Sequence, residues 1–497
     1  HRNCELQSLA ERLGIREIRF ENHREEKPID TSTPAIIRDP NKCILCRRCV
    51  AVCEQIQSVN AIGPYGRGLS TQIGPAWGED MNNSPCVQCG QCTLVCPVGA
   101  LYEKDYTEEV WDALYDPDKV VIVQTAPATR VSIGEPFGLP QGSISTGKMV
   151  AALRQLGFDK VFDTNFAADV TIMEEGSELL DRLANGGDLP LITSCSPGWI
   201  KFMEEFYPEL SGNVSSCKSP QQMFGALTKT YYAEKTGIDP ANMVVVSIMP
   251  CTAKKFECQR PEMTASGFQD VDYVLTVREL ANMIKQAGID FNDLAEEEYD
   301  DPLGISTGAA VIFGATGGVM EAAVRTAYEL YTGKTLEKID FEMVRGLDGV
   351  KEASVDLNGT VLNIAVASGL GNARVILDRV KSGEAQYHFI EIMTCPGGCI
   401  GGGGQPIPTD RDIVKKRMEA IYEVDRNMPL RKSHENPAVK ELYETYLGKP
   451  LSQKSHHLLH TTYSWRSPFG AMVYKDDQGV WALDRAAQGG SGNKGDS

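Results

Sequence analysis

The stretch YHFIEIMTCPGGCIGGGGQP, residues 387–406, joins a short apolar run to two cysteines and a series of glycines. The residues before Cys395 have the pattern of a buried β-strand. Cys395 and Cys399 lie four residues apart around two glycines, and the later glycines let the backbone approach a bulky group without Cβ collisions. A nucleotide loop is the alternative for a glycine run, but no helical pattern follows directly, which disfavours a phosphate site.

Three other segments also pass from a buried-strand pattern into Pro, Gly or Cys. They are VVIVQTAPAT (120–129), LPLITSCSPGW (189–199) and MVVVSIMPCTAKKFE (243–257). Helical patterns such as TIMEEGSELLDRLANG lie between them, so the region after about residue 118 is predicted to be α/β. Ligands of α/β sheets gather at the carboxyl ends of strands, so we expect the cysteines there to converge: Cys195, Cys251, Cys395 and Cys399.

Two cysteine runs near the N-terminus, CILCRRCVAVC and CVQCGQCTLVCP, share the spacing C-x2-C-x2-C-x3-C. In this spacing three thiolates hold one iron–sulfur cubane and the fourth points to the other cluster. The runs therefore predict two [4Fe–4S] clusters, one on Cys43, Cys46, Cys49 and Cys96 and the other on Cys86, Cys89, Cys92 and Cys53. Structural zinc sites are the alternative, but they would require four ligands in two pairs.

Composition and charge narrow the class of protein. The 15 cysteines of the 497 residues lie in tight runs or after apolar stretches, which indicates metal binding in a reducing compartment, hence a cytoplasmic protein. The net charge of −18 argues against nucleic acid as a partner, and no apolar run approaches the roughly 18 residues of a membrane span.

The chain begins with His1 rather than Met, so we expect that an N-terminal part was cut away or left out. Cys4 is then either the last ligand of a further upstream iron–sulfur cluster or a free buried thiol. We predict a remnant of that upstream region at 1–33, an α+β ferredoxin-like domain at 34–112, an α/β domain at 113–465 and an extension at 466–497. The extension contains a strand-like segment, VYKDDQGVWAL, and ends in ten residues of flexible composition.

The motifs TSCSPGW, MPCTAKKFE and ExMxCPGGCxxGGGQP occur in this order behind the ferredoxin-like segment. Together they resemble the catalytic subunit of [FeFe]-hydrogenases, and the resemblance runs from residue 34 to about 463. It implies an α/β catalytic domain with two lobes around an H-cluster, in which a [4Fe–4S] cubane is bridged to a two-iron unit carrying CO, cyanide and azadithiolate. The implied reaction is the reversible reduction of protons to H₂.

The resemblance also implies roles for single residues. Cys251, Cys395 and Cys399 would be cubane ligands, with Cys399 as the bridge to the two-iron unit. The Lys254 ammonium group would suit an anionic cyanide ligand. The pocket for the diatomic ligands would be shaped by Ala126, Pro127, Gln221, Met249 and Met393. Without the motifs, a methionine beside a strand end would be core filling.

A proton must also reach the buried metal. By resemblance its route runs from Cys195 through Glu257 and Ser215 to Glu178. A thiol has a reference pKa near 8.5, so it can donate and recover a proton, and carboxylates can continue the relay. Arg182, four residues after Glu178, would orient it, although the pattern alone would suggest a surface ion pair.

The first motif departs from the commonest family form, in which the position of Ser196 is a second Cys that ligates the cubane. Cys217, in NVSSCKSPQQ, stands where a small apolar residue is usual. We therefore hypothesise that Cys217 is the fourth ligand. A Ser196 alkoxide, which is a harder ligand, and a damaged or empty site are the alternatives. Cys258 has no role in the pattern.

The unusual first motif resembles subunits of NAD(P)-linked, electron-bifurcating complexes. The implied partners are protons and H₂, ferredoxin and/or flavin- and NAD(P)-binding subunits, and maturation proteins that insert the two-iron unit. An H₂ sensor is one alternative, but sensors tend to lose the relay residues that are present here. A hydrogenase-like iron–sulfur assembly protein is another, and it would not need Lys254.

Overall fold

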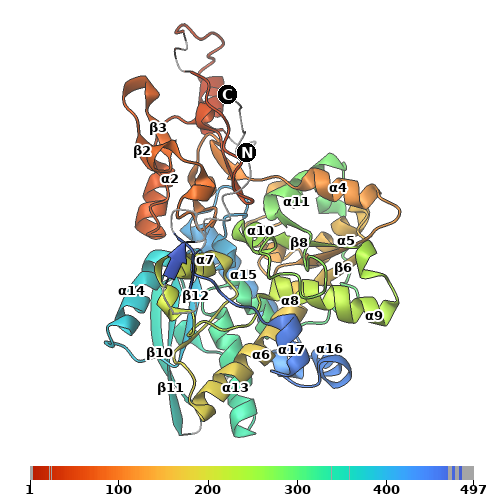
Figure 1. The fold of residues 1–497 in the computed structure, drawn as a ribbon. Coiled ribbons are helices and arrows are strands. Elements are labelled where there is room, and N and C mark those ends of the chain that lie inside the picture. The colour runs from red at the N-terminus through yellow and green to blue at the C-terminus, as the bar shows by residue number, and fades with distance from the viewer. Residues whose placement is uncertain are drawn as a thin grey trace, which may run out of the picture.

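The computed structural model describes residues 4–21, 23, 25–336, 339–357, 359–467, 473–475 and 481–483. Two lobes, each built on a four-stranded sheet, lie below a smaller N-terminal part that contains both cysteine runs (Figure 1). The α/β class predicted from the strand patterns is confirmed, as is the ferredoxin-like part before it.

The sheet of the first lobe is parallel throughout, in the order β6-β5-β8-β9. Its strands are β5 (Val120–Thr125), β6 (Lys160–Asp163), β8 (Met243–Met249) and β9 (Tyr273–Thr276). Alternate side chains of β5 enter different cores, because Val121 and Val123 pack with α5 (Thr146–Leu156) and α11 (Val277–Gln286), whereas Ile122 faces α8 (Pro220–Leu227). Both faces are therefore buried, as is usual for a parallel sheet.

The second lobe has a mixed sheet in the order β10-β11-β12-β7. An antiparallel hairpin, β10 (Val350–Leu357) and β11 (Thr360–Ser368), extends the parallel strands β12 (Phe389–Met393) and β7 (Leu191–Ile192). Helices α7 (Pro197–Phe206) and α14 (Leu370–Lys381) pack on one face, and α13 (Gly318–Thr332) packs on the other.

The long helix α6 (Thr164–Asn185) joins the lobes, because it packs against α8 of the first and α13 of the second. Its first three turns are almost entirely buried. The Asp163 carboxylate caps the N-terminus by accepting from the amide of Asn165 at 3.1 Å, and Gly186, at φ 80°, ends the helix. Side chains of α6 therefore lie in the interior between the two sheets.

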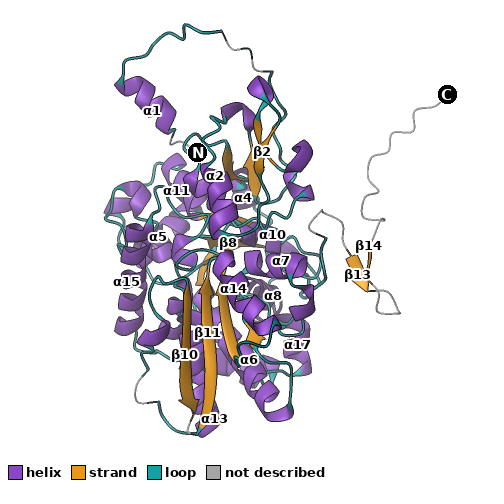
Figure 2. Cartoon of the chain, turned by 90° about the vertical axis from the view of Figure 1, so that its left-hand side faces the viewer, coloured by secondary structure: helices purple, strands orange, loops and turns teal. Residues whose placement is uncertain are grey.

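The ferredoxin-like part pairs β1 (Ile36–Arg38) with β4 (Leu101–Glu103) in antiparallel fashion. It also contains the short helices α2 (Arg48–Ala51) and α3 (Gln91–Val95) and the hairpin of β2 (Gly63–Tyr65) and β3 (Gln72–Gly74). Helix α1 (Glu5–Arg12) lies at the described N-terminal end (Figure 2). The Cys4 thiol is partly exposed and caps α1 by accepting from the amide of Gln7, so it is not the buried thiol that was one of the two expectations.

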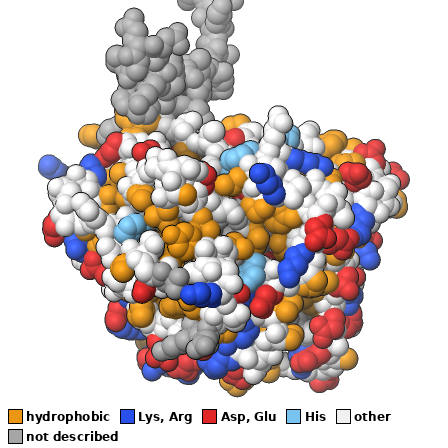
Figure 3. All heavy atoms as spheres, turned by 90° about the horizontal axis from the view of Figure 1, so that it is seen from below, with side chains coloured by type: hydrophobic (Ala, Val, Ile, Leu, Met, Phe, Trp, Pro, Cys, Tyr) orange, Lys and Arg blue, Asp and Glu red, His pale blue; other side chains and the backbone are white. Residues whose placement is uncertain are grey.

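The remaining helices cover the lobes. They are α4 (Thr107–Tyr115), α9 (Ala233–Thr236), α10 (Ala253–Glu257), α12 (Gly308–Val311), α15 (Arg411–Asn427), α16 (Pro437–Leu442) and α17 (Gln453–Leu459). Within the described residues no helix is long and apolar enough to cross a membrane. On the lower face of the molecule, apolar side chains are surrounded by charges of both signs (Figure 3).

In the C-terminal extension, the strand-like segment forms an antiparallel pair, β13 (Val473–Lys475) with β14 (Trp481–Leu483). The final ten residues, expected to be flexible, lie outside the described residues, as does His1. The domain limits at 34–112 and 113–465 remain predictions.

Candidate active site

A cavity lies where the carboxyl ends of strands from both lobes meet. Its walls come from the segments after β5, β7, β8 and β12 and from the first residues of α6 and α8, with Phe313 and one residue of the ferredoxin-like part, Cys89. The predicted convergence of Cys195, Cys251, Cys395 and Cys399 is found, because all four line this cavity. The strand ends therefore form one site from segments as far apart in the sequence as Ala126 and Gly402.

The residues expected to shape a ligand pocket lie in the same walls. Ala126 and Pro127 follow β5, Gln221 lies on α8, and Met249 and Met393 end β8 and β12. The methionines give the walls a soft, apolar character, and the Gln221 amide donates weakly to the carbonyl of Lys254 at 3.3 Å.

Three thiols in the cavity have the chemistry of an iron–sulfur ligand set. Burial, and then the nearby Cys251, raises the pKa of Cys399 to about 12. The pKa of Cys395 rises for the same two reasons. Thiols so close together become good ligands when metal replaces their protons, and the glycine backbone beside them leaves room for a cluster. The donor set therefore fits an iron–sulfur cubane.

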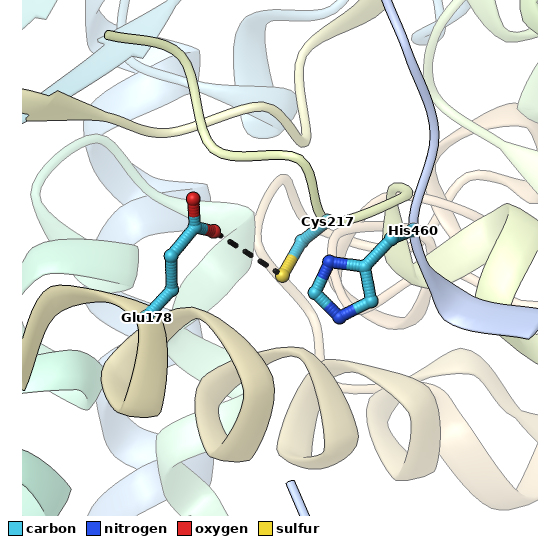
Figure 4. Close-up of side chains that lie close together, drawn as sticks. All are labelled: Glu178, Cys217 and His460. Carbon is cyan, nitrogen blue, oxygen red and sulfur yellow. Dashed lines mark hydrogen bonds between the residues drawn. The ribbon is translucent and has the colours of Figure 1, made fainter. Parts of the chain in front are cut away.

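Cys217 does not line this cavity, which argues against the hypothesis that it is the fourth cubane ligand. Its thiol is fully buried beside Glu178, with Sγ 4.0 Å from Oε2, and His460 lies next to it (Figure 4). Ser196, the alternative, lines the cavity and pairs with the hydroxyl of Thr394 at 2.8 Å. Ser196 is the N-cap residue of α7, shortly after β7, whereas Cys217 forms a β-bridge with His460, far along the chain.

Lys254 and Glu257 form a buried ion pair at the wall. Lys254 Nζ lies 2.9 Å from Oε2 of Glu257 and donates to the carbonyl of Cys195 at 3.1 Å. The same Glu257 oxygen also accepts from Ser219 at 2.8 Å and Gln221 at 3.1 Å. These bonds fix the ammonium group in the cavity wall.

Glu257 is therefore not in a position to pass a proton from Ser215 to Cys195, as the predicted route requires. Among the described residues it makes no hydrogen bond to Ser215, the next group of the predicted route. The outer end of that route is present: Ser215 donates to Glu178 at 2.8 Å, and Arg182 donates to the same carboxylate at 2.6 Å.

Glu175, which the sequence reasoning missed, lies in the gap between Cys195 and Ser215. Burial, then the nearby Glu178, raises the pKa of Glu175 to about 8, while Ser215 and the amide of Ser194 lower it. Burial, and then Glu175, in turn raises the pKa of Cys195. Within the described residues neither Glu175 oxygen has a direct hydrogen-bond partner. The signal was available, because Glu175 precedes Glu178 by three residues and shares its face of α6.

The ferredoxin-like part brings its eight cysteines into two groups. Cys43, Cys46, Cys49 and Cys96 line one small cavity. In the other group, burial and then neighbouring thiols, Cys53 among them, raise the pKa values of Cys86, Cys89 and Cys92. Both runs repeat one backbone shape, with Leu45 and Gln88 at φ 59° and 57° and Arg47 and Gly90 at φ 61° and 69°. Left-handed residues at equivalent positions make concave loops that fit an anionic cluster.

The second cysteine run comes very close to the cavity loop. A Cβ on Gly403 would lie 2.3 Å from the carbonyl oxygen of Cys89, so only glycine allows this approach. Gln91 Nε2 donates to the carbonyl of Gly401 at 2.9 Å, and Thr252 donates to the carbonyl of Gln88 at 2.7 Å. These contacts hold a cluster site directly against the cavity.

Fold and site together define an iron–sulfur oxidoreductase with a buried, thiol-lined catalytic cavity. Residues 119–403 match the model of the iron only hydrogenase large subunit, C-terminal domain. Residues 411–466 match that of the iron hydrogenase small subunit, and residues 33–102 match the ferredoxin-like domain of NADH-quinone oxidoreductase subunit 3. The chain therefore belongs to the iron-only, or [FeFe], hydrogenase family.

Sequence similarity to known hydrogenases extends over almost the whole chain. The NADP-reducing hydrogenase subunit HndD of Solidesulfovibrio fructosivorans is 56% identical over 93% of this chain and 80% of its own. Iron hydrogenase 1 of Clostridium pasteurianum is 45% identical over 93% and 81%. A solved variant of the [FeFe]-hydrogenase HydA1 of Chlamydomonas reinhardtii superposes with a TM-score of 0.65 at 46% identity, covering 73% of this chain and all of that one.

The expected hydrogenase class is thus confirmed, and the chain is an oxidoreductase that acts on H₂, with [4Fe–4S] clusters and the H-cluster as cofactors. The assembly-protein alternative is less well supported, since a cytosolic Fe-S cluster assembly factor of Danio rerio is only 30% identical.

Proposed function

We propose that this chain interconverts two protons and two electrons with H₂ in the cavity between its lobes, using a proton route on α6 and an electron route through the ferredoxin-like part. The observation that carries the proposal is the meeting of three thiols with the buried relay groups Cys195 and Glu175. When bound, the H-cluster supplies the redox-active iron at which protons and electrons meet.

The chain's own residues prepare the cavity in two ways. Cys251, Cys395 and Cys399 would hold the cubane, and Lys254, fixed by Glu257, would present a positive charge to an anionic ligand of the two-iron unit. Apolar walls from Met249, Met393 and Phe313 keep bulk water out, which strengthens that interaction.

Protons would pass from solvent to Glu178, through the hydroxyl of Ser215 to Glu175, and on to the thiol of Cys195. Glu175 suits the inner position, because a carboxyl group with a pKa of about 8 holds a proton at neutral pH and can release it. Arg182 would act as a positioning residue, since it fixes the outer carboxylate while also donating to the carbonyl of Gly212.

Electrons would enter through the two cluster sites of the ferredoxin-like part. The inner site includes Cys89, which also lines the cavity beside Cys395. The close backbone contact at Gly403 supports a short path between that cluster and the cubane.

For the fourth cubane position we propose Ser196, because it lines the cavity where Cys217 does not. An oxygen ligand there would be harder than thiolate and would lower the reduction potential of the cubane.

We further propose that the chain works as the hydrogen-converting subunit of an NAD(P)-linked cytoplasmic complex, with a flavin- and nucleotide-binding partner and with maturation proteins that load its two-iron unit. The name of the relative HndD, an NADP-reducing hydrogenase subunit, supports this proposal. The isolated, matured chain should reduce a viologen dye with H₂ but not NADP⁺, and adding the partner should restore NADP⁺ reduction. NADP⁺ reduction by the chain alone would contradict the proposal.

An H₂ sensor remains the second candidate, because it would share the cluster. The series of acid and thiol groups on this route favours an enzyme, since a sensor needs no rapid proton supply. Turnover in steady state distinguishes the two: a sensor would bind H₂ but evolve it only slowly.

A further inference from the structure

The side chains of Glu178, Cys217 and His460 form a cluster, and the proposed hydrogen chemistry uses only Glu178 of the three. They come from α6, from the loop before α8 and from the segment after α17, yet a ligand atom of each lies within 4.8 Å of the others. Figure 4 shows the Cys217 thiol between the Glu178 carboxylate and one nitrogen of the His460 ring. A buried thiol, an imidazole and a carboxylate converge here on one point.

The imidazole ring of His460 is oriented in the way that is usual for a metal-binding histidine, by a carboxylate on the ring nitrogen that faces away from the site. Its Nε2 lies 3.1 Å from Oε2 of Glu174, so the nitrogen that faces Cys217 is Nδ1. Glu174 is itself fixed, because it accepts from Tyr443 at 2.6 Å and from Ser455 at 2.7 Å. A carboxylate behind a histidine sets its tautomer and raises its basicity as a ligand. Ser216, now 2.8 Å from Nδ1, is the group a metal would displace.

Charge at the cluster also favours a cation. Glu174 and Glu178 lie one turn apart on α6, and the side chain of Glu174 is completely buried. The ion-pair partner of this group is Arg182, which bonds the outer oxygen of Glu178 and leaves Oε2 facing the thiol. One sulfur, one nitrogen and one oxygen ligand are a donor set that Zn²⁺ accepts readily, with a fourth position for water or the Ser215 hydroxyl.

We propose that Glu178, Cys217 and His460 form a Zn²⁺ site whose occupation closes the proton route. On binding, the thiol of Cys217 gives up its proton to solvent and the sulfur bonds the metal. The Glu178 oxygen that accepts from Ser215 becomes a metal ligand, so the carboxylate can no longer pass a proton inward. The regulatory consequence rests on the proposed function of Glu178 and Ser215, whereas the binding site does not.

The test uses the matured, iron-replete chain, incubated with ZnSO₄ and passed over a desalting column. X-ray absorption at the zinc edge reports on zinc alone, so the iron clusters do not contribute to the spectrum. It should show about one bound Zn²⁺ with one sulfur at about 2.3 Å and nitrogen or oxygen at about 2.0 Å. Zinc trapped at a damaged cluster site would instead show three or four sulfurs, and that result, or no retained zinc, would overturn the site.

Cys217→Ala removes one ligand and should weaken Zn²⁺ binding by about 100-fold. Cys258→Ala is the matched control, because Cys258 is an equally buried thiol that donates only to the carbonyl of Lys255. The iron content of each variant checks folding, and His460→Gln provides a second ligand variant if Cys217→Ala fails that check. Equal zinc retention in the ligand variants and the control would overturn the site.

H₂ evolution with a reduced viologen dye tests the consequence, with each variant's rate expressed relative to its own rate without zinc. Saturating Zn²⁺ should slow the wild type and Cys258→Ala at least about tenfold and Cys217→Ala less than about twofold. If zinc binds with one sulfur ligand but H₂ evolution is not inhibited, the claim that Zn²⁺ blocks proton transfer through Glu178 is wrong. That result would also contradict the proposed place of Glu178 on the proton route. A chain with no hydrogenase activity would refute the proposed function but leave the absorption test of the site intact.

Discussion

The hydroxyl of Ser215 donates a hydrogen bond of 2.8 Å to Oε2 of Glu178, while Arg182 holds the other oxygen of the same carboxylate at 2.6 Å. This arrangement fixes the outer half of the proposed proton route. The inner half depends on Glu175, since no hydrogen bond joins Ser215 to Glu257 in the part of the chain that is described.

Replacing Glu175 with Gln should therefore lower H₂ evolution by about 100-fold or more, because an amide cannot accept and release the proton that passes to Cys195. Rates with a reduced viologen dye measure this effect, and iron analysis confirms that the clusters are present. The loss should be equal in both directions of catalysis.

Glu257→Gln is the matched comparison, since Glu257 is the relay that the motif pattern suggested. The amide oxygen can still accept from Lys254 and Ser219, so the rate should fall less than about tenfold. If the rate of H₂ evolution falls more in Glu257→Gln than in Glu175→Gln, the route through Glu257 that the family resemblance implied would be supported instead.

Stability should depend on pH through Glu175. Its pKa rises from 4.5 to about 8 on folding, so between these values the folded chain holds a proton that the unfolded chain releases. The free energy of unfolding therefore falls as pH rises through this window and levels off above about pH 8.

Glu175→Gln removes this penalty, which at pH 7 is at most about 3 kcal/mol. The difference in melting temperature between the variant and the wild type should grow in favour of the variant from pH 6 to pH 8. A constant difference over that range would show that Glu175 is ionised in the folded chain.

Two substitutions decide the fourth cubane position. Ser196→Cys should keep a full cubane and raise its reduction potential, because thiolate is the softer ligand. Cys217→Ala should leave the iron and sulfide content unchanged, as expected for a thiol outside the cavity. If Cys217→Ala loses about the iron content of one cluster, Cys217 would be a ligand of the cubane after all.

Lys254→Met should leave Glu257 as an unpaired buried charge, which costs about 3–5 kcal/mol. The double variant Lys254→Met/Glu257→Gln should recover most of the lost stability but not the activity, because the ammonium group in the cavity wall is still missing. Melting temperature and H₂ evolution separate the two effects. Recovery of activity in the double variant would show that Lys254 acts only on stability.

The motifs predicted the positions of β5, β7, β8 and β12 well, because a buried strand followed by Pro, Gly or Cys has few other uses in an α/β fold. Local spacing likewise predicted how the thiols would group. What the sequence could not provide was the packing of α6 across both lobes, which brings Glu175 to Cys195 and Ser215. The sequence suggested a ligand role for Cys217 for the same reason. Its distance from the cavity depends on the contact with His460, which lies far along the chain.

Infrared spectroscopy of the anaerobically matured chain tests the central claim most directly, because CO and cyanide bound to iron absorb where protein does not. If the cavity holds the H-cluster, the chain should show both sets of bands, they should shift under H₂, and Glu175→Gln should keep the bands while losing turnover. A matured chain with its full complement of [4Fe–4S] iron but without CO and cyanide bands would contradict the account.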